Sequence, residues 1–176
     1  MLALKQSKRP WTRRFSTACG SEDPAKTEST MKTAGYSGTP LARKLGIKDN
    51  CRLKLIHQPP HYVGLLADLP PGVRIVKDSR TRKDVIHYFA ENPAGLEKEI
   101  KRLKEEMGVN GALWISWPKK SSGRQTDPDE NLIRDLALKS GLVDVKVCAI
   151  DEVWSGLKLV IRLKDRGGTL ERNAKK

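Results

Sequence analysis

Ammonium and hydroxyl groups gather in one short segment of the sequence, PKKSSG, residues 118–123. Lysine and serine side chains donate hydrogen bonds, so a loop of this kind suits the binding of an anion. The segment DEVWSG, residues 151–156, adds two carboxylates, an indole and a hydroxyl, and we expect Trp117 and Trp154 to form an apolar wall. The candidate ligand-binding residues of the two segments are Trp117, Lys119, Lys120, Ser121, Ser122, Asp151, Glu152, Trp154 and Ser155.

An ordinary structural role is the alternative for each of these residues. In that interpretation Trp117 covers the end of a helix, and the two lysines lie in a solvated loop. Asp151 and Glu152 are then turn residues or partners of nearby lysines. Trp114 and Ile115, which precede the loop, are expected in the core in both interpretations.

A glycine-rich turn leads into a short helix near residue 40. Thr39 is a suitable N-cap, proline is favoured at the next position, and Gly46 is a typical helix end. Backbone N–H groups at such a turn can bind an anion, although the Gly-Lys-Ser/Thr ending of a P-loop is missing. A tight turn with a helix cap is the alternative. The further candidate residues are Gly35, Tyr36, Ser37, Gly38 and Thr39.

The cysteines and histidines indicate neither a metal site nor a disulfide framework. Cys19, Cys51 and Cys148 are odd in number and far apart, which is typical of a reducing compartment. His57 and His61 have i,i+4 spacing, but two prolines between them prevent a helix from presenting them as a metal pair. We therefore interpret His57 and His61 as surface or loop histidines, whereas His87 falls in the nearly all-apolar run DVIHYFA, which is typical of a buried central strand. No catalytic triad follows from spacing.

The elements that must position the candidate residues alternate along the chain. Alternating or continuous apolar runs predict strands over 51–57, 73–78, 84–90, 111–117, 143–150 and 156–163. Short helices are expected after Pro40 and around residues 62–67. Apolar residues at helical spacing predict one long helix from Pro93 to Gly108. They predict another with Asp127 as N-cap, Pro128 at its first position and Gly141 at its end.

Strands that alternate with helices indicate a parallel sheet covered on both faces. The short connection between the last two strands makes that pair antiparallel. We therefore predict a three-layer, Rossmann-like α/β fold whose mostly parallel sheet ends in an antiparallel β-hairpin. Ligands bind such sheets at the carboxyl ends of the strands, where we expect the loops HQPPHY, KDSRTR, AENP, WPKKSSG and DEVWSG.

The charge is unevenly distributed along the chain. The net charge is +13, of which residues 1–30 contribute +3 and the last fifteen residues +4. We expect a disordered leader over 1–32 (a start-site extension before Met31, or a mitochondrial presequence), one domain over 33–164 and a disordered basic tail over 165–176. No segment has the roughly 20 apolar residues of a membrane span, and we expect a cytoplasmic location, or the mitochondrial matrix if the presequence is real.

Two segments resemble the end of Rossmann-like methyltransferases. GVNGALWISW is similar to a late strand of that fold, and GLVDVKVCAIDEVWSGLKLVIRL is similar to its terminal hairpin. The resemblance implies a Gly-x-Gly turn after the first strand and an acidic residue after the second, both of which contact S-adenosylmethionine. Here HQPPHY stands in place of the turn, and Asp78 is followed at once by Ser79 and Arg80. We therefore predict no cofactor.

Three blocks together resemble the bacterial family known as domain of unknown function 3052. They are AGYSGTPLARKLGIK, GALWISWPKKSSG and GLVDVKVCAIDEVWSGLKLV, and the resemblance spans roughly residues 33 to 164. It implies a cytoplasmic bacterial-type domain that begins close to Met31. It implies no reaction, cofactor or catalytic residue.

Three functions are consistent with these patterns. The leading hypothesis is a non-enzymatic binding or regulatory module for an anionic small molecule or an acidic protein. The second is a diverged S-adenosylmethionine-dependent methyltransferase-like enzyme. The third is a nucleic-acid-associated protein that binds through its basic ends.

Overall fold

The computed structural model describes residues 38–123 and 128–166. The predictions for the leader, for Asp127 and for the chain after residue 166 lie outside the described residues. Within the described ranges, no helix combines the length and the apolar character needed to cross a membrane.

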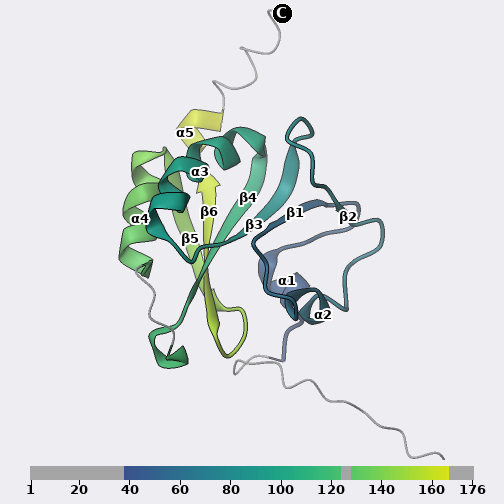
Figure 1. Ribbon diagram of the computed structural model, residues 1–176. Coiled ribbons are helices and arrows are strands. Elements are labelled where there is room, and N and C mark those ends of the chain that lie inside the picture. The colour runs from purple at the N-terminus through teal and green to yellow at the C-terminus, as the bar shows by residue number, and fades with distance from the viewer. Residues whose placement is uncertain (1–37, 124–127, 167–176) are drawn as a thin grey trace, which may run out of the picture. The chain divides into compact units, whose positions relative to one another are not determined.

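The described residues form one mixed sheet of six strands: β1 (Arg52–Ile56), β2 (Arg74–Ile75), β3 (Lys83–Phe89), β4 (Met107–Pro118), β5 (Leu142–Ala149) and β6 (Trp154–Ile161). Their order in space is β2-β1-β3-β4-β6-β5 (Figure 1). The first four strands are parallel, and β6 pairs antiparallel with both β4 and β5. The predicted α/β class, with a mostly parallel sheet and a closing hairpin, is confirmed.

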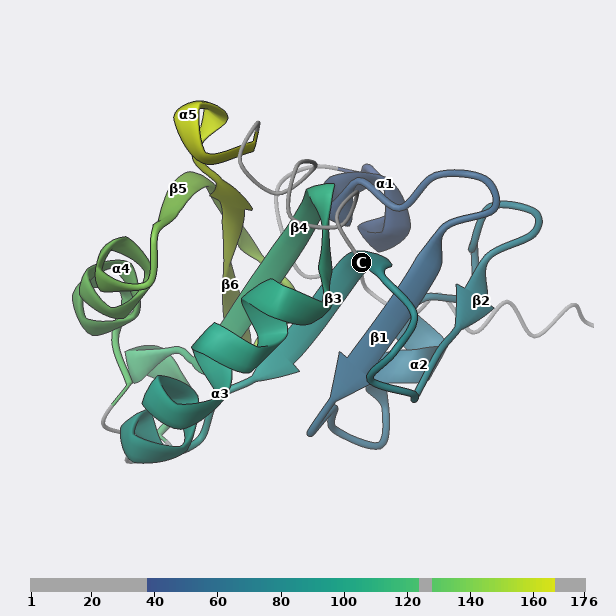
Figure 2. The same ribbon diagram turned by 90° about the horizontal axis from the view of Figure 1, so that it is seen from above.

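Helices lie on both faces of the sheet (Figure 2). One face packs against α3 (Pro93–Glu106) and α4 (Glu130–Lys139), and the other against the short helices α1 (Leu41–Leu45) and α2 (Tyr62–Leu65). After β6, the chain forms the short helix α5 (Leu163–Arg166), so that the first two residues of the predicted tail are helical.

The ends of the long helices follow local chemistry, with two corrections to the predicted boundaries. The Asn92 side chain accepts a hydrogen bond from the Ala94 N–H and caps α3. That helix ends at Glu106, and β4 begins at Met107, four residues earlier than predicted. The N-cap of α4 is Asp129 and not Asp127, because its carboxylate accepts the Leu132 N–H. As predicted, Gly141 follows α4 with a positive φ of 74°.

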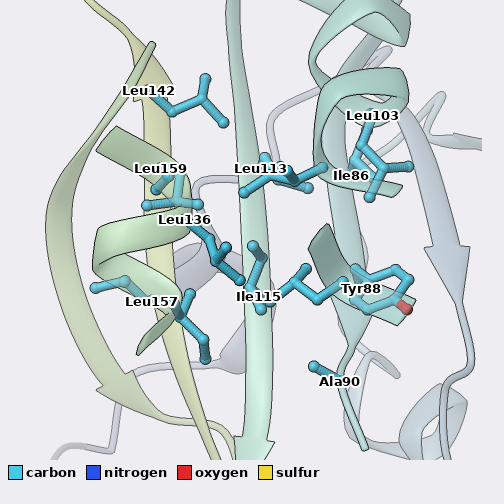
Figure 3. Close-up of a cluster of buried hydrophobic side chains, with 14 of the residues drawn as sticks. Ile86, Tyr88, Ala90, Leu103, Leu113, Ile115, Leu136, Leu142, Leu157 and Leu159 are labelled. Atoms are coloured by element: carbon cyan, nitrogen blue, oxygen red, sulfur yellow. The ribbon is translucent and has the colours of Figure 1, made fainter. Parts of the chain in front are cut away.

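Apolar side chains fill a separate core on each face of the sheet, because successive residues of a strand point to opposite faces. The first core contains side chains of β3, β4 and β6 together with Leu103 and Leu136 of the two long helices (Figure 3). The second core contains Leu45 of α1, Tyr62 of α2 and the strand residue Trp114. The Trp114 indole N–H donates to the Leu45 carbonyl at 2.9 Å, which fixes α1 on the sheet.

Candidate functional site

Four loops meet at the end of the sheet where the parallel strands finish, which we name the carboxyl edge. It comprises residues 57–61 after β1, 90–92 after β3, 119–123 after β4 and the β5–β6 turn, 150–153. In Figure 1 the β5–β6 turn and the chain after β4 lie at the same, lower end of the sheet. The chain continues from β1 to its outer neighbour β2 and from β3 in the opposite direction to β4. The carboxyl ends of β1 and β3 therefore flank a topological switch point, where open α/β sheets bind ligands.

Asp151 is the centre of the hydrogen bonds at this edge. Its Oδ1 accepts the backbone N–H groups of Val153 and Trp154, both at 2.7 Å. Its Oδ2 lies 2.9 Å from Nε2 of His61, ninety residues earlier in the chain. Because a carboxylate accepts hydrogen bonds, the His61 Nε2–H donates here, and Nδ1 is left as the acceptor nitrogen of the neutral ring. The Asp151 side chain is only 11% exposed, whereas that of His61 is 55% exposed.

Lys119 joins the third loop to the same turn. Its Nζ donates to the Asp151 carbonyl at 2.7 Å, and its backbone N–H donates to the Val153 carbonyl, also at 2.7 Å. An ammonium group has three N–H donors, so one protein contact leaves capacity for a ligand. The structure thus brings two of the candidate residues, Lys119 and Asp151, into direct contact.

The remaining candidate residues are divided between the surface and the core. Lys120, Ser121 and Glu152 are exposed at the carboxyl edge. The Ser122 hydroxyl donates to the Lys119 carbonyl, and Ser155 is paired with Trp117 across the β4–β6 ladder. Of the glycine-rich turn, Gly38 is exposed and Thr39 is half-buried, while Gly35, Tyr36 and Ser37 lie outside the described residues.

The expected wall of Trp117 and Trp154 is wrong. The β4–β6 register pairs Trp117 with Ser155 and Trp154 with Pro118. Side chains one residue apart in a ladder point to opposite faces of the sheet, so that Trp117 lies in the core beneath α3 and α4, and Trp154 lies in the other core. Both side chains are buried, and neither faces a ligand beside the other.

The expectation that KDSRTR belongs wholly to the carboxyl edge is also wrong. These residues, 77–82, connect the carboxyl end of β2 to the amino end of β3. The Asp78 carboxylate accepts the Thr81 N–H at 2.6 Å and lies 3.8 Å from the ammonium group of Lys83, the first residue of β3. Most of this segment therefore leaves the carboxyl edge.

The histidines differ from one another in burial. His57 and His61 are exposed loop residues, as predicted. His87 lies fully buried in β3, which agrees with the predicted buried strand over 84–90. Its Nδ1 is 2.5 Å from the Tyr62 hydroxyl, and its Nε2 is 2.6 Å from the Ser116 hydroxyl. Burial lowers the pKa of His87 to about 3, so that the imidazole is neutral at physiological pH.

The Tyr62–His87–Ser116 hydrogen bonds join α2, β3 and β4 inside the second core. Burial, followed by the nearby charges of Cys148 and Asp151, raises the pKa of the Tyr62 phenol. All three side chains are fully buried, so this arrangement stabilises the domain rather than offering a nucleophile to a substrate. The nearly all-apolar run DVIHYFA predicted the burial of His87, but no local pattern indicated its two hydrogen-bond partners.

A second cluster of charged groups lies near the amino ends of β3 and β4, and we name it the amino-edge ion cluster. It contains Lys54, Lys83, Glu106 and Arg102. Oε2 of Glu106 lies 2.5 Å from the Lys54 ammonium and 3.3 Å from that of Lys83, and Arg102 lies 3.5 Å from Oε1. Burial raises the pKa of the Glu106 carboxyl, but hydrogen bonds and charges from the two lysines outweigh this, and its pKa lies below its ordinary value.

No metal site emerges among the residues that the structure describes, since they contain no group of three or more histidine, cysteine or acidic residues placed to hold an ion. Cys51 and Cys148 are free thiols, and burial is the main cause that raises the pKa of each. A raised pKa keeps a thiol protonated and weakens it as a nucleophile.

The carboxyl edge does not fit S-adenosylmethionine in the manner that the methyltransferase resemblance implies. Pro59 and Pro60 have no N–H groups to donate in the loop after β1, and the Pro59 carbonyl already accepts the Tyr62 N–H in a closed turn. The acidic residue after β2, Asp78, contacts Thr81 and Lys83 rather than an open site.

Comparison with known proteins yields similar folds only. No family model and no curated protein matches the sequence, so the resemblance to domain of unknown function 3052 stays a prediction. A possible exported protein from Bordetella parapertussis superposes with a TM-score of 0.49 and 13% identity over 69% of this chain and 65% of that one.

Two of the other similar structures are methyltransferases. An O-methyltransferase of neocarzinostatin biosynthesis, in complex with S-adenosylmethionine, gives a TM-score of 0.48 and 12% identity over 63% of this chain and 49% of that one. Magnesium protoporphyrin IX methyltransferase from Synechocystis gives a TM-score of 0.45 and 12% identity over 69% of this chain and 74% of that one. The chain thus spans less than two thirds of the first two structures.

Proposed function

We propose that this domain is an enzyme with a methyltransferase-like fold that binds an anionic small molecule at the carboxyl edge and uses His61 as a proton acceptor. The single observation that carries the proposal is the 2.9 Å contact between the exposed His61 ring and the buried Asp151 carboxylate. This contact favours an enzyme over a purely binding role, but it does not support the use of S-adenosylmethionine that the second of the three hypotheses includes.

The burial difference between the two partners supports a general base. A carboxylate that holds one ring nitrogen orients the imidazole and stabilises its protonated form, as in catalytic dyads and triads. Asp151 is itself held by two backbone N–H groups of its turn, so the acceptor cannot swing away. In the proposed step, Nδ1 of His61 takes a proton from an acidic O–H or C–H group of the substrate. The oxygen or carbon atom keeps the electron pair of the broken bond, and the imidazolium is paired with Asp151.

The charges around the dyad support an anionic substrate. The ammonium group of Lys119 donates a hydrogen bond to the Asp151 carbonyl, and the next residue, Lys120, is exposed. Lys119 precedes the short 3₁₀ turn Lys120–Ser122, and Lys120 is its first residue. The turn ends at Gly123, which has a positive φ of 70°. Two cations beside a neutral imidazole favour a substrate that carries negative charge before the proton is removed.

The test separates proton acceptance from anion binding. The variant His61→Gln keeps an amide N–H for Asp151 but has no basic nitrogen, and His57→Gln is the matched control in the same loop. We expect carbethoxylation, followed by mass spectrometry, to modify His61 faster than His57, and Asp151→Asn to slow the reaction at His61. Equal rates at the two histidines, unaffected by the Asp151 change, would contradict the proposal.

Binding is measured by NMR titration with inorganic phosphate and with S-adenosylmethionine. We expect phosphate to shift the resonances of His61, Lys119 and Lys120, and Lys120→Glu to weaken that binding by about tenfold. S-adenosylmethionine is expected to cause no shift at the carboxyl edge. If phosphate binding is independent of pH both in the wild type and in His61→Gln, the result would favour the non-enzymatic binding module instead.

A further inference from the structure

We propose that a second surface, the basic strip over residues 74–83, binds the phosphate backbone of nucleic acid. The strip contains five cationic residues and one acidic residue, a net charge of +4, whereas residues 31–161 together carry +6. One of the five, Lys83, is buried in the amino-edge ion cluster, and the other four are exposed. Most of the excess charge of the domain therefore lies in ten consecutive residues. It uses none of the carboxyl-edge residues, so it stands independently of the proposed enzyme.

Three side chains of the strip are free to bind a partner. Arg74, Lys77 and Arg80 are exposed, and among the described residues none of them forms a hydrogen bond or ion pair through its side chain. The strip begins on β2, which is the outer strand of the sheet (Figure 1). No neighbouring strand covers these groups on that side.

The arginines of the long helices are different. On α3, Arg102 pairs with Glu99, and on α4, Arg134 pairs with Glu130 and Asp144. Arginines paired in this way already have anionic partners within the chain. The strip therefore differs from the two long helices, because Arg74 and Arg80 have no carboxylate partner among the described residues whereas Arg102 and Arg134 do.

The carboxylates close to the strip are already occupied. Asp78 accepts the Thr81 N–H and faces Lys83, and Asp84 forms a two-point contact with the Arg52 guanidinium at 3.1 and 3.2 Å. Neither of them forms an ion pair with Arg74, Lys77 or Arg80. The positive potential of the strip is therefore available to an outside partner.

Hydrogen bonds at both ends hold the strip in one conformation. The N–H groups of Arg74 and Val76 donate to carbonyls of β1 at 2.9 and 2.8 Å. At the other end, Arg82 donates to the carbonyls of Glu105 and Met107, and Lys83 donates to the Asp78 carbonyl. A cationic surface that is already ordered loses less conformational entropy on binding.

The distribution of the cations favours a chain of phosphates over one small anion. Arg74 lies on β2, and Lys77 and Arg80 follow three and six residues later along the strip. Cations spread along a segment in this way can contact successive phosphates of a nucleic acid strand. A membrane surface is less suitable, because only one large apolar side chain of the strip, Ile75, is strongly exposed.

The experiment compares two charge-reversed forms of the full chain. R74E/K77E/R80E changes the strip, and K98E/K101E/K139E changes three exposed lysines of α3 and α4 by the same net charge. Binding of a fluorescent mixed-sequence oligonucleotide, single-stranded and duplex, is followed by anisotropy over a salt series. Circular dichroism confirms that both variants are folded.

We expect the strip variant to lose about tenfold or more in affinity and to lower the slope of log K against log salt by about 2–3, one unit or slightly less for each lost phosphate contact. The helix variant should change both values much less. Equal losses in the two variants would overturn the proposal in favour of a general charge effect, and so would unchanged binding, which would leave the basic ends as the binding surface. Tighter binding to phosphatidylserine vesicles than to the oligonucleotide, abolished by the strip variant, would identify a membrane surface instead.

Discussion

The two ends of the sheet use similar groups for different purposes. At the amino-edge ion cluster, Lys54, Lys83 and Glu106 have side chains that are 9%, 0% and 5% exposed. At the carboxyl edge, Asp151 is equally well buried, but its partner His61 is half exposed. A pair enclosed on all sides can only stabilise the fold, whereas a pair with one partner in solvent can also act on a ligand.

The comparison also shows why a buried charge is not by itself a sign of function. Perturbed titration often marks active sites, yet structural ion networks shift pKa values as well. The lowered pKa of Glu106 has its cause in the adjacent lysines. The two lysines that hold Glu106 are buried, whereas His61, the partner of Asp151, is exposed, and this difference separates the pairs at the two edges.

The largest expected effect is the loss of the carboxylate in the amino-edge ion cluster. Glu106→Gln leaves the buried Lys54 ammonium without its counter-charge and Lys83 with only Asp78 at 3.8 Å, which we expect to lower the free energy of unfolding by about 3–5 kcal/mol. Urea denaturation measures the change. Glu105→Gln is the matched control, because its side chain is exposed one residue earlier. A similarly small change for both variants would mean that the cluster contributes little to stability.

Acidification tests the buried histidine against the exposed ones. The pKa of His87 is about 3 in the folded chain and about 6.5 in the unfolded chain. Between these values only the unfolded chain binds the proton, so stability falls as the pH is lowered, by about 1.4 kcal/mol per pH unit from this group. Denaturation at about pH 7 and about pH 5 should therefore differ by about 2 kcal/mol.

NMR assigns this effect to His87. Its ring resonances should not titrate between about pH 8 and about pH 5, because the folded pKa lies below that range. A His87 ring that becomes protonated in the folded protein within this window would contradict both the burial argument and the expected loss of stability.

A smaller effect is expected at the carboxyl edge. Asp151→Ala removes the acceptor of two turn N–H groups and the partner of His61, and we expect a loss of about 1–2 kcal/mol. Thermal and urea unfolding measure the loss. Glu152→Ala, exposed in the same turn, should change stability by less than about 0.5 kcal/mol. If the Asp151 variant matched this control, the turn would not depend on the carboxylate.

Local patterns predicted most of the fold. Alternation and apolar runs located all six strands, helical spacing located α3 and α4, and glycine at position 141 marked the end of α4. The order of strands and helices implied the parallel sheet and the closing hairpin. The ends of the helices were predicted less accurately. Asp127 and Asp129 both precede α4 and both are good N-cap residues, so the sequence does not decide between them.

The candidate site was only partly predictable. That the loops after β4 and between β5 and β6 would meet followed from topology, and Lys119 and Asp151 do meet. His61 was missed as a partner because the ninety residues that separate it from Asp151 carry no local signal of their contact. The basic strip was visible as a run of charge, but which of its cations are already neutralised depends on contacts made in the folded chain.

The amino-acid sequence by itself determined the types and order of the elements, because helix and strand periods, caps and turn residues act over a few neighbouring residues. Only the tertiary structure decided which face each side chain occupies and which distant groups meet. The strand register sends Trp117 and Trp154 to opposite cores, and sheet packing buries His87 while leaving His61 in solvent beside Asp151. Register and burial are properties of the whole sheet, and the chemistry of this protein depends on them.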